Sequence, residues 1–231
     1  MGVLDDIRRA AFELRRTDPQ EAVRVLRRAA ALGGEAEVLA RGALGEIYLE
    51  EFGDLDGAEH EFRKVLGAAP GLIAAQIGLA RTRREAGDFA EAEAGFERAL
   101  RGLTRDLREL KKGPLPAGAE ELVLTLLEVA VELAELRASA APDQRVPVEI
   151  DEDLLRWAAA EKLFDAEGDA DDWVRFHSLW TELRLLTGRG EEAITELQEA
   201  AQLPADERAR LVDLARDDLG LPPLVQLGKK N

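Results

Sequence analysis

Along most of the chain, apolar residues recur every three or four positions and charged residues fill the positions between them. Segments of about 12 to 16 residues with this pattern lie between short breaks that are rich in Gly, Asp and Pro, such as "TDP" at 17–19, "GG" at 33–34, "FGD" at 52–54, "AAPG" at 68–71 and "AGD" at 86–88. This spacing puts the apolar side chains on one face of an α-helix, and very short breaks make successive helices antiparallel neighbours. The pattern predicts an all-α fold built from antiparallel helix pairs.

The helix pairs repeat along the chain. Four segments carry Ala, an apolar residue four positions later, and a small or β-branched residue three positions after that: Ala22/Leu26/Ala29, Ala58/Phe62/Val65, Ala92/Phe96/Ala99 and Ala193/Leu197/Ala200. The first three alanines are 36 and 34 residues apart, and the fourth follows 101 residues later. A period near 34 indicates a stacked helical repeat, whereas the alternative, a generic Ala-rich helix bundle, has no reason to repeat at this interval.

These residues make the chain resemble the tetratricopeptide repeat family. The best copy runs from Ile73 to about Asp106, and the copy before it matches well apart from one extra residue around Glu50–Phe52. Weaker copies cover 3–36 and about 174–208. We interpret the following residues as the structural signature of the repeats: Ala22, Leu26, Gly45, Tyr48, Ala58, Phe62, Pro70, Gly87, Ala92, Phe96, Ala99, Trp180, Gly188, Ala193 and Leu197.

The signature has a physical reason. Small residues let two antiparallel helices approach closely, and a bulky neighbour fills the space beside the crossing. Gly before Asp can end one helix in a left-handed conformation and cap the next. Because one pair cannot cover its own apolar face, pairs stack into a superhelix. We therefore expect a solenoid similar to tetratricopeptide repeats, an antiparallel helix-turn-helix repeat array of about ten or eleven helices.

The middle of the chain departs from the repeat. Residues 119–137 predict one long helix that is apolar nearly all round, a pattern typical of buried helices. Two interpretations stay open: burial inside this chain's own solenoid, or a surface that forms a homodimer seam or the wall of a peptide groove. The expected organisation is repeats over 1–112, the long apolar helix over 113–140, a linker over 141–150, a C-terminal helical block with a degenerate repeat over 151–220, and a tail over 221–231.

Composition narrows the classes of partner. Of the 231 residues, 34% are charged and the formal net charge is −16, which repels phosphate backbones and anionic lipids. We therefore expect neither a nucleic-acid nor a membrane partner. The chain has no Cys, which excludes disulfides, Cys zinc sites, iron–sulfur clusters and Cys nucleophiles. The first residues, "MGVLDDIRRAAFEL", lack the apolar core of a secretory signal. From this and from the absence of Cys, we expect a cytoplasmic protein.

Few residues support catalysis or metal binding. His60 has no second His four positions on, as a zinc helix requires, and His177 precedes a Ser that lies outside any Gly-x-Ser-x-Gly elbow. The acidic stretch at 165–173 has Ala170 and Phe176 where a calcium loop needs Gly and Glu. We expect no catalytic, metal-binding or cofactor-binding residue, and hence a protein that is not an enzyme.

The resemblance implies a binding face. In the family, the first helix of each pair lines the concave side of the superhelix, which here would present Leu39, Glu46, Leu49, Ala74, Ile77, Arg81 and Arg84. Arginines in such a groove could bind an acidic peptide or a C-terminal carboxylate. The alternative is that Arg81 and Arg84 pair with nearby carboxylates such as Glu46 or Glu85. The Lys and Asn clamp of the members that bind chaperone tails is absent, because the only Asn is Asn231.

Two functions follow from these expectations. The leading hypothesis is a non-enzymatic scaffold or adaptor that binds a protein or peptide in the concave groove. The alternative is a self-associating structural or regulatory subunit, a homodimer that forms through the apolar helix 119–137.

Substitutions at the third repeat test the alignment. Ala92→Leu should force the paired helices apart and lower the free energy of unfolding by about 1–3 kcal/mol. Phe96→Ala should leave a cavity and lower it by about 3–5 kcal/mol. Chemical denaturation measures both, and two neutral variants would show that the repeat register is wrong.

Overall fold

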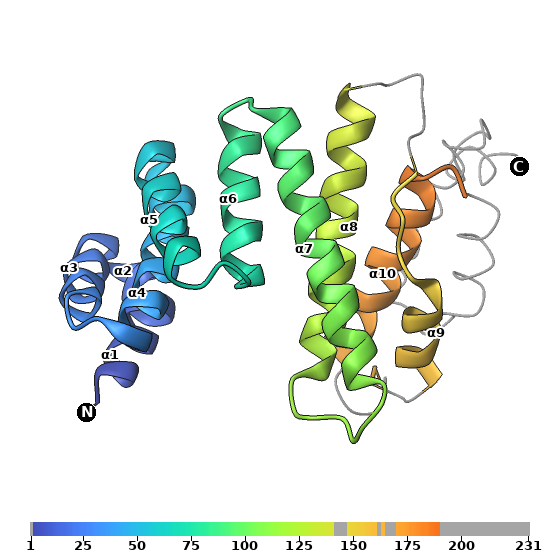
Figure 1. The fold of residues 1–231 in the computed structure, drawn as a ribbon, viewed down its shortest axis with the longest axis horizontal. Helices are drawn as coiled ribbons and strands as arrows, with labels where there is room; N and C mark the ends of the chain where they lie inside the picture. Colours follow the sequence, from blue (N-terminus) through green and yellow to red (C-terminus); the bar gives the residue numbers. More distant parts are fainter. Residues whose placement is uncertain (1, 141–146, 161–162, 165–169, 190–231) are drawn as a thin grey trace, which may run out of the picture. The chain divides into compact units, whose positions relative to one another are not determined.

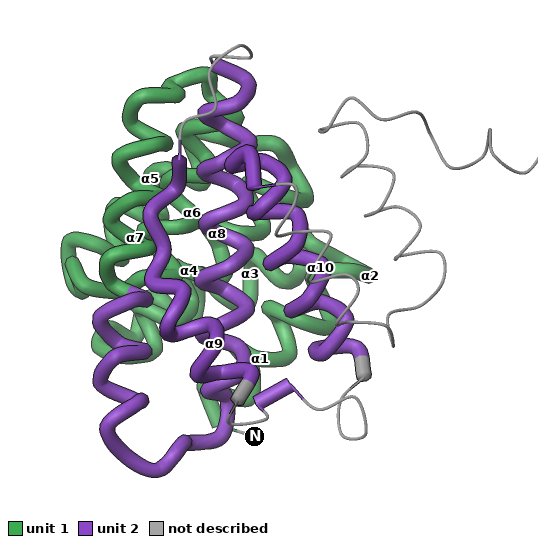
Figure 2. The backbone as a smooth tube through the Cα atoms, turned by 90° about the vertical axis from the view of Figure 1, so that its right-hand side faces the viewer, with its two compact units in different colours: residues 1–102 green, residues 103–231 purple. Residues whose placement is uncertain are grey.

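The computed structural model describes residues 2–140, 147–160, 163–164 and 170–189. Within these ranges the secondary structure is helical and contains no strand, as the sequence predicts. The chain divides into two compact units, Met1–Gly102 and Leu103–Asn231 (Figure 2). Unit 1 holds three helix pairs, in which successive helices pack on one another (Figure 1).

The first pair consists of a helix that includes α1 (Val3–Arg9) and α2 (Arg15–Thr17), followed by α3 (Pro19–Ala30). The second is α4 (Gly34–Ile47) with α5 (Leu55–Ala68), and the third is α6 (Ile73–Glu85) with α7 (Phe89–Leu110). Helix α3 packs on α4, α4 on α5 and α5 on α6, so each pair covers the apolar face of the next. The all-α, repeat-like fold expected from the sequence is confirmed.

The turns use the residues that the pattern predicted. Asp54 caps α5, since its carboxylate accepts a hydrogen bond of 3.0 Å from the Gly57 N–H, and Asp18 caps α3 in the same way. Gly53 and Gly87 adopt left-handed conformations with φ of 60° and 82°. Asp88, which precedes α7, has a different partner from the two capping aspartates: its carboxylate accepts a hydrogen bond of 2.6 Å from the guanidinium of Arg83.

The extra residue of the second repeat is absorbed inside a helix. After α4 the helix continues as a π-helical turn, Tyr48–Phe52, and ends at Gly53. A π turn bonds each residue to the fifth one along and so holds one residue more than an α turn. A similar turn, Ala10–Leu14, joins α1 to α2. The first helices of the first two pairs are therefore both widened near their C-terminal ends.

The core of unit 1 is organised around Phe62 of α5, which is 1% exposed. A Cβ atom placed on Gly45 of α4 would lie 2.7 Å from its ring, and one on Gly78 of α6 would lie 2.3 Å from it. Such distances are too short for real atoms, so the two glycines are what lets three helices meet at one ring.

The other signature residues take the places expected of contact or turn residues. The buried members are Ala22, Leu26, Tyr48, Ala58, Ala92, Phe96, Ala99 and Trp180. Pro70 lies in the turn before α6, and its carbonyl accepts a hydrogen bond from the side chain of Gln76. Gly188 has a left-handed φ of 79°. Ala193 and Leu197 lie outside the described residues.

Unit 2 contains the second half of α7 with α8 (Ala119–Ala140), α9 (Glu152–Ala160) and α10 (Ala170–Leu186). Helix α10 packs along α8. Leu122 is partly exposed, and the other large apolar side chains of α8 are buried within the chain: Val123, Leu124, Leu126, Leu127, Val129, Val131, Leu133 and Leu136. This burial favours the first of the two interpretations of the apolar helix over a seam between copies.

The boundary between the units falls inside α7, after Gly102, whereas the sequence suggested a division at 112. The reason is the length of α7: Leu103 and Leu107, 1% and 0% exposed, belong to the contacts of unit 2. Of the expected linker, residues 147–150 have no regular structure and 141–146 lie outside the described residues, as does the expected tail 221–231.

The close approach at Phe62 predicts opposite effects for two helical glycines. Gly78→Ala should lower the free energy of unfolding by about 1–3 kcal/mol, because its new methyl group meets the Phe62 ring. Gly42→Ala on α4 is the matched control, since a Cβ there meets nothing within 4 Å. It should raise the free energy of unfolding by about 0.5–1 kcal/mol through helix propensity. Equal effects of the two variants in urea denaturation would contradict the packing described.

Candidate peptide-binding cleft

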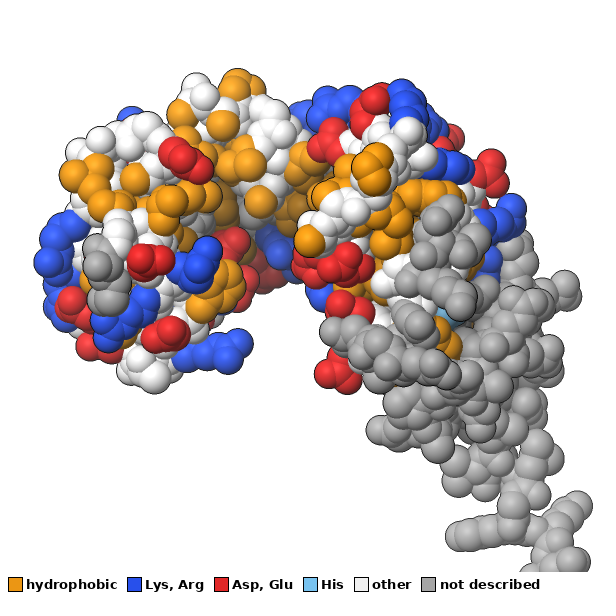
Figure 3. Space-filling view, turned by 90° about the horizontal axis from the view of Figure 1, so that it is seen from below, with side chains coloured by type: hydrophobic (Ala, Val, Ile, Leu, Met, Phe, Trp, Pro, Cys, Tyr) orange, Lys and Arg blue, Asp and Glu red, His pale blue; other side chains and the backbone are white. Residues whose placement is uncertain are grey.

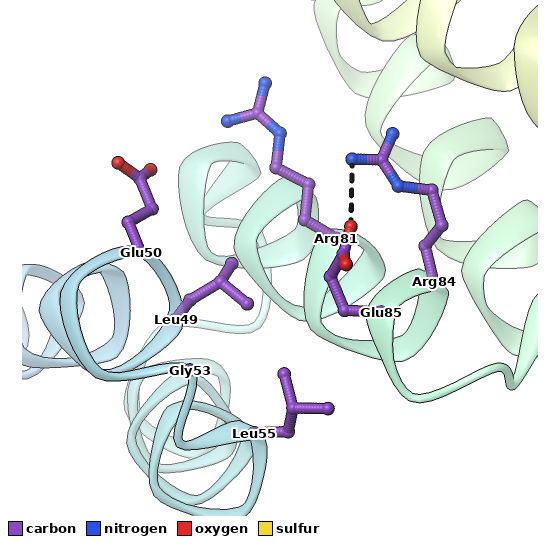
Figure 4. Close-up of a pocket in the computed structure, with 7 residues that line it drawn as sticks. All are labelled: Leu49, Glu50, Gly53, Leu55, Arg81, Arg84 and Glu85. Carbon is purple, nitrogen blue, oxygen red and sulfur yellow. Dashed lines mark ion pairs between the residues drawn. The ribbon is translucent and has the colours of Figure 1, made fainter.

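Unit 1 contains an open cleft of about 480 Å³ where the first helices of the second and third pairs end (Figure 4). The π-helical turn after α4, the start of α5 and the last turns of α6 form it. We call this the arginine cleft, and define it by its lining residues: Leu49, Glu50, Gly53, Leu55, Arg81, Arg84 and Glu85.

Helix geometry places the two arginines together. Arg81 and Arg84 lie three positions apart on α6, so their side chains leave the same face of the helix. Figure 4 shows the two guanidinium groups extending on the same side of α6, while Leu49 and Leu55 supply an aliphatic wall. Arg84 forms an ion pair of 3.5 Å with Glu85, in which both side chains are partly exposed. The cleft thus combines aliphatic surface with cationic hydrogen-bond donors.

A second charge cluster adjoins the cleft. Arg15, just after the first π turn, binds Glu51 at 2.8 Å and also Glu50, and lies 3.6 Å from Glu46. Burial lowers the pKa of Arg15, but the hydrogen bonds and charges of these glutamates outweigh it and raise that pKa above its ordinary value. Arg15 therefore stays charged and ties the first helix of pair one to the widened end of pair two.

Glu46 lies within the fields of two arginines, Arg15 and Arg81. Its pKa is raised above the ordinary value, chiefly because the surrounding protein restricts hydration of the carboxylate and also because Glu50 is near. Arg15 and Arg81 oppose this shift without cancelling it. Since 52% of its side chain remains accessible, the carboxylate is poorly solvated yet open to an approaching group.

The structure distributes the seven predicted binding residues unequally. Leu49, Arg81 and Arg84 line the arginine cleft. Glu46 does not line it, but the charge of Arg81 lowers the pKa of Glu46 and so opposes the effect of burial. Leu39, 44% exposed, and Ala74 are accessible but do not line it. The prediction for Ile77 is corrected: it is only 6% exposed, because its side of α6 is covered by the core.

Sequence reasoning missed Arg15, Glu50 and Leu55. A signal for the first two was present, because Arg15, Glu50 and Glu85 follow one another at steps of 35 residues, the spacing of the first helices. Leu55 gave no such signal, because it belongs to a second helix and reaches the cleft only through the turn at Gly53.

Both histidines lie in the described part of the structure, whereas residues 165–169 of the acidic stretch lie outside it. His60 is exposed, and His177 lies against the rings of Trp173 and Phe176. No group of His, Asp and Glu suited to hold a metal ion occurs in the described part of the chain. Among the helices described, none is long and apolar enough to cross a membrane. Figure 3 shows cationic and anionic side chains interspersed on the visible face.

Comparison with known proteins agrees with this architecture. Residues 49–111, which run from the π turn after α4 to the end of α7, match the family model described as tetratricopeptide repeat. This match supports tetratricopeptide repeat sequence over residues 49–111, the second half of the second helix pair and the third pair. No curated protein matches the chain. Tetratricopeptide repeats are generally protein–protein interaction modules, and their family is generally of scaffold type and not enzymatic.

The raised pKa of Glu46 predicts a pH dependence of stability. A carboxyl group whose pKa is higher in the folded than in the unfolded protein binds its proton more tightly when folded. The unmodified protein should therefore gain stability, relative to Glu46→Gln, as the pH falls through the folded pKa of Glu46 towards its ordinary value. Urea denaturation of both proteins across this range measures the difference. A difference that stays constant or changes in the opposite direction would contradict the restricted hydration of Glu46.

Proposed function

We propose that the protein is a non-enzymatic scaffold that binds a segment of a partner protein along the exposed face of the first helices of unit 1, with the arginine cleft as its recognition site. The observation that carries this proposal is the convergence of Leu49, Arg81 and Arg84 on one open cleft. They come from two successive first helices; Arg81 and Arg84 are not part of the core, and Leu49 packs against it while staying partly accessible.

The cleft suggests the chemistry of the partner. A guanidinium group binds a carboxylate through two parallel hydrogen bonds, so Arg81 and Arg84 suit an acidic side chain or a C-terminal carboxylate. The pair between Arg84 and Glu85 does not prevent this, because an ion pair between exposed groups contributes little and can be exchanged. Leu49 and Leu55 would contact an aliphatic side chain beside the acid.

Self-association through the apolar helix has less support. It requires an accessible apolar face on α8, and all the large apolar side chains of that helix except the partly exposed Leu122 are buried within the chain. Partner binding at the arginine cleft, whose lining is accessible, is therefore better supported than self-association through α8.

Affinity purification followed by mass spectrometry tests the proposal. The Arg81→Ala/Arg84→Ala variant should lose the stoichiometric partner that the unmodified protein recovers, because the carboxylate of the partner would lose both cationic donors. Arg101→Ala/Arg105→Ala is the matched control: it removes the same charge from α7, where these side chains are 67% and 69% exposed and do not line the cleft.

Two results would contradict the proposal. One is that no protein is recovered in stoichiometric amount. The other is that the Arg81/Arg84 variant recovers the same proteins as the control. Circular dichroism of each variant establishes that it is folded before the comparison.

A further inference from the structure

A second cleft, of about 400 Å³, lies on a different part of unit 1, between α5, α6 and α7. Its lining includes the aliphatic side chains of Leu66 and Leu79 and the small residues Ala94 and Gly95. Three arginines and a single glutamate also line it, namely Arg63, Arg83, Arg98 and Glu91, in a chain whose formal net charge is −16. We call it the outer cleft. It shares no lining residue with the arginine cleft.

The preceding helix pair shows what occupies the corresponding place. There, Arg41 of α4 binds the carboxylate of Glu61 of α5 at 2.8 Å, and Glu61 is only 9% exposed. In the third pair, Gln76 follows Arg41 at the 35-residue step of the first helices. Gly95 follows Glu61 at the 34-residue step of the second helices. Both replacements line the outer cleft.

Because Gly95 replaces Glu61, the third pair has no carboxylate at this position of its second helix. Gly95 has no side chain, and a Cβ there would lie 2.8 Å from the Cβ of Ala80, so the two helices approach closely at this point. In the preceding pair the glycine lies on the first helix instead. Gly45 stands there at the position of Ala80, and Glu61 stands at the position of Gly95. Gln76 donates a hydrogen bond of 2.9 Å to the carbonyl of Pro70. The cleft therefore lacks the acidic side chain that fills the equivalent place one repeat earlier.

The arginines of the outer cleft differ in their engagement. Arg83 is 14% exposed and bound by Glu59, Asp88 and Glu91. Arg63 is 62% exposed and has one pair, with Glu59 at 2.7 Å. Arg98 is exposed, and no carboxylate among the residues that the structure describes forms an ion pair with it. Arg63 and Arg98 are thus placed to receive an anionic group, while Arg83 keeps its place within the fold.

We propose that the outer cleft is a second protein-docking site, which takes an acidic segment of a partner protein. An Asp or Glu side chain of the partner occupies the place that Glu61 fills in the preceding pair and binds Arg98 and Arg63. An aliphatic neighbour in the segment contacts Leu66 and Leu79. The lining argues for an acidic occupant, because a basic segment would meet the exposed guanidinium of Arg98, which pairs with no carboxylate of the described residues, and that of Arg63, which has a single ion pair.

A selection from a random peptide display library on the immobilised full-length protein tests this site. We expect selected peptides to carry Asp or Glu beside an aliphatic residue, and to bind at least about tenfold more weakly when that acid is replaced by its amide. Fluorescence anisotropy with the synthesised peptides measures the affinities.

Two variants of the protein, each with a matched control, locate the binding. Arg98→Glu reverses the charge at position 98, and Ala94→Glu places a competing carboxylate in the cleft; each should weaken binding at least about tenfold. Arg101→Glu and Ala90→Glu introduce the same changes on α7 at residues that do not line the cleft, and they should bind as the unmodified protein does. Circular dichroism checks the fold of each variant. If Ala94→Glu does not fold, Arg98→Glu alone tests whether the peptides bind in the outer cleft.

The same peptides separate this proposal from the arginine cleft. Binding in the outer cleft should persist in Arg81→Ala/Arg84→Ala. The proposal is overturned if the selection yields no peptides, or only peptides that need no acid. It is also overturned if binding survives Arg98→Glu, including the case in which the peptides depend on Arg81 and Arg84 instead.

Discussion

The arrangement of unit 1 depends on the packing of one aromatic ring between two glycines. Phe62 of α5 contacts both Gly45 of α4 and Gly78 of α6, at distances that leave no room for a Cβ atom on either glycine. This contact sets the separation of the first helices of two successive pairs. Because Leu49 lies in the π turn that continues α4, and Arg81 and Arg84 lie on α6, the position of the proposed binding residues follows from a contact inside the core.

Arginine serves three purposes in unit 1. Arg83 and Arg41 are held by carboxylates of neighbouring helices and contribute to the fold. Arg15 joins the widened ends of two first helices through three glutamates. Arg81, Arg84, Arg63 and Arg98 line clefts. We propose that the same side chain is a structural group where it joins neighbouring helices and a recognition group where it lines a cleft.

The sequence predicted much of the fold because the repeat is a local pattern. The signature alanines and phenylalanines recur at intervals that a helix translates directly into one buried face, and in the described residues they are buried. The site was predicted less completely. Ile77 satisfied the spacing of the exposed face yet is buried, and Leu55 satisfied no spacing yet lines the cleft. The π turn at Tyr48–Phe52 explains part of the difference, because it changes the register of the helix just where the cleft forms.

By itself, the sequence determined the helix pairs, their turns and their resemblance to tetratricopeptide repeats, since these depend on the order of small, bulky and capping residues over short distances. It also showed that both Gly45 and Phe62 belong to the repeat signature. Only the tertiary structure decided that Gly78 shares the ring of Phe62, that Arg15 reaches Glu50, and that Gln76 and Gly95 line a cleft where Arg41 and Glu61 form an ion pair one repeat earlier. These relations join residues on different helices, and they depend on distances that no periodicity along one helix can specify.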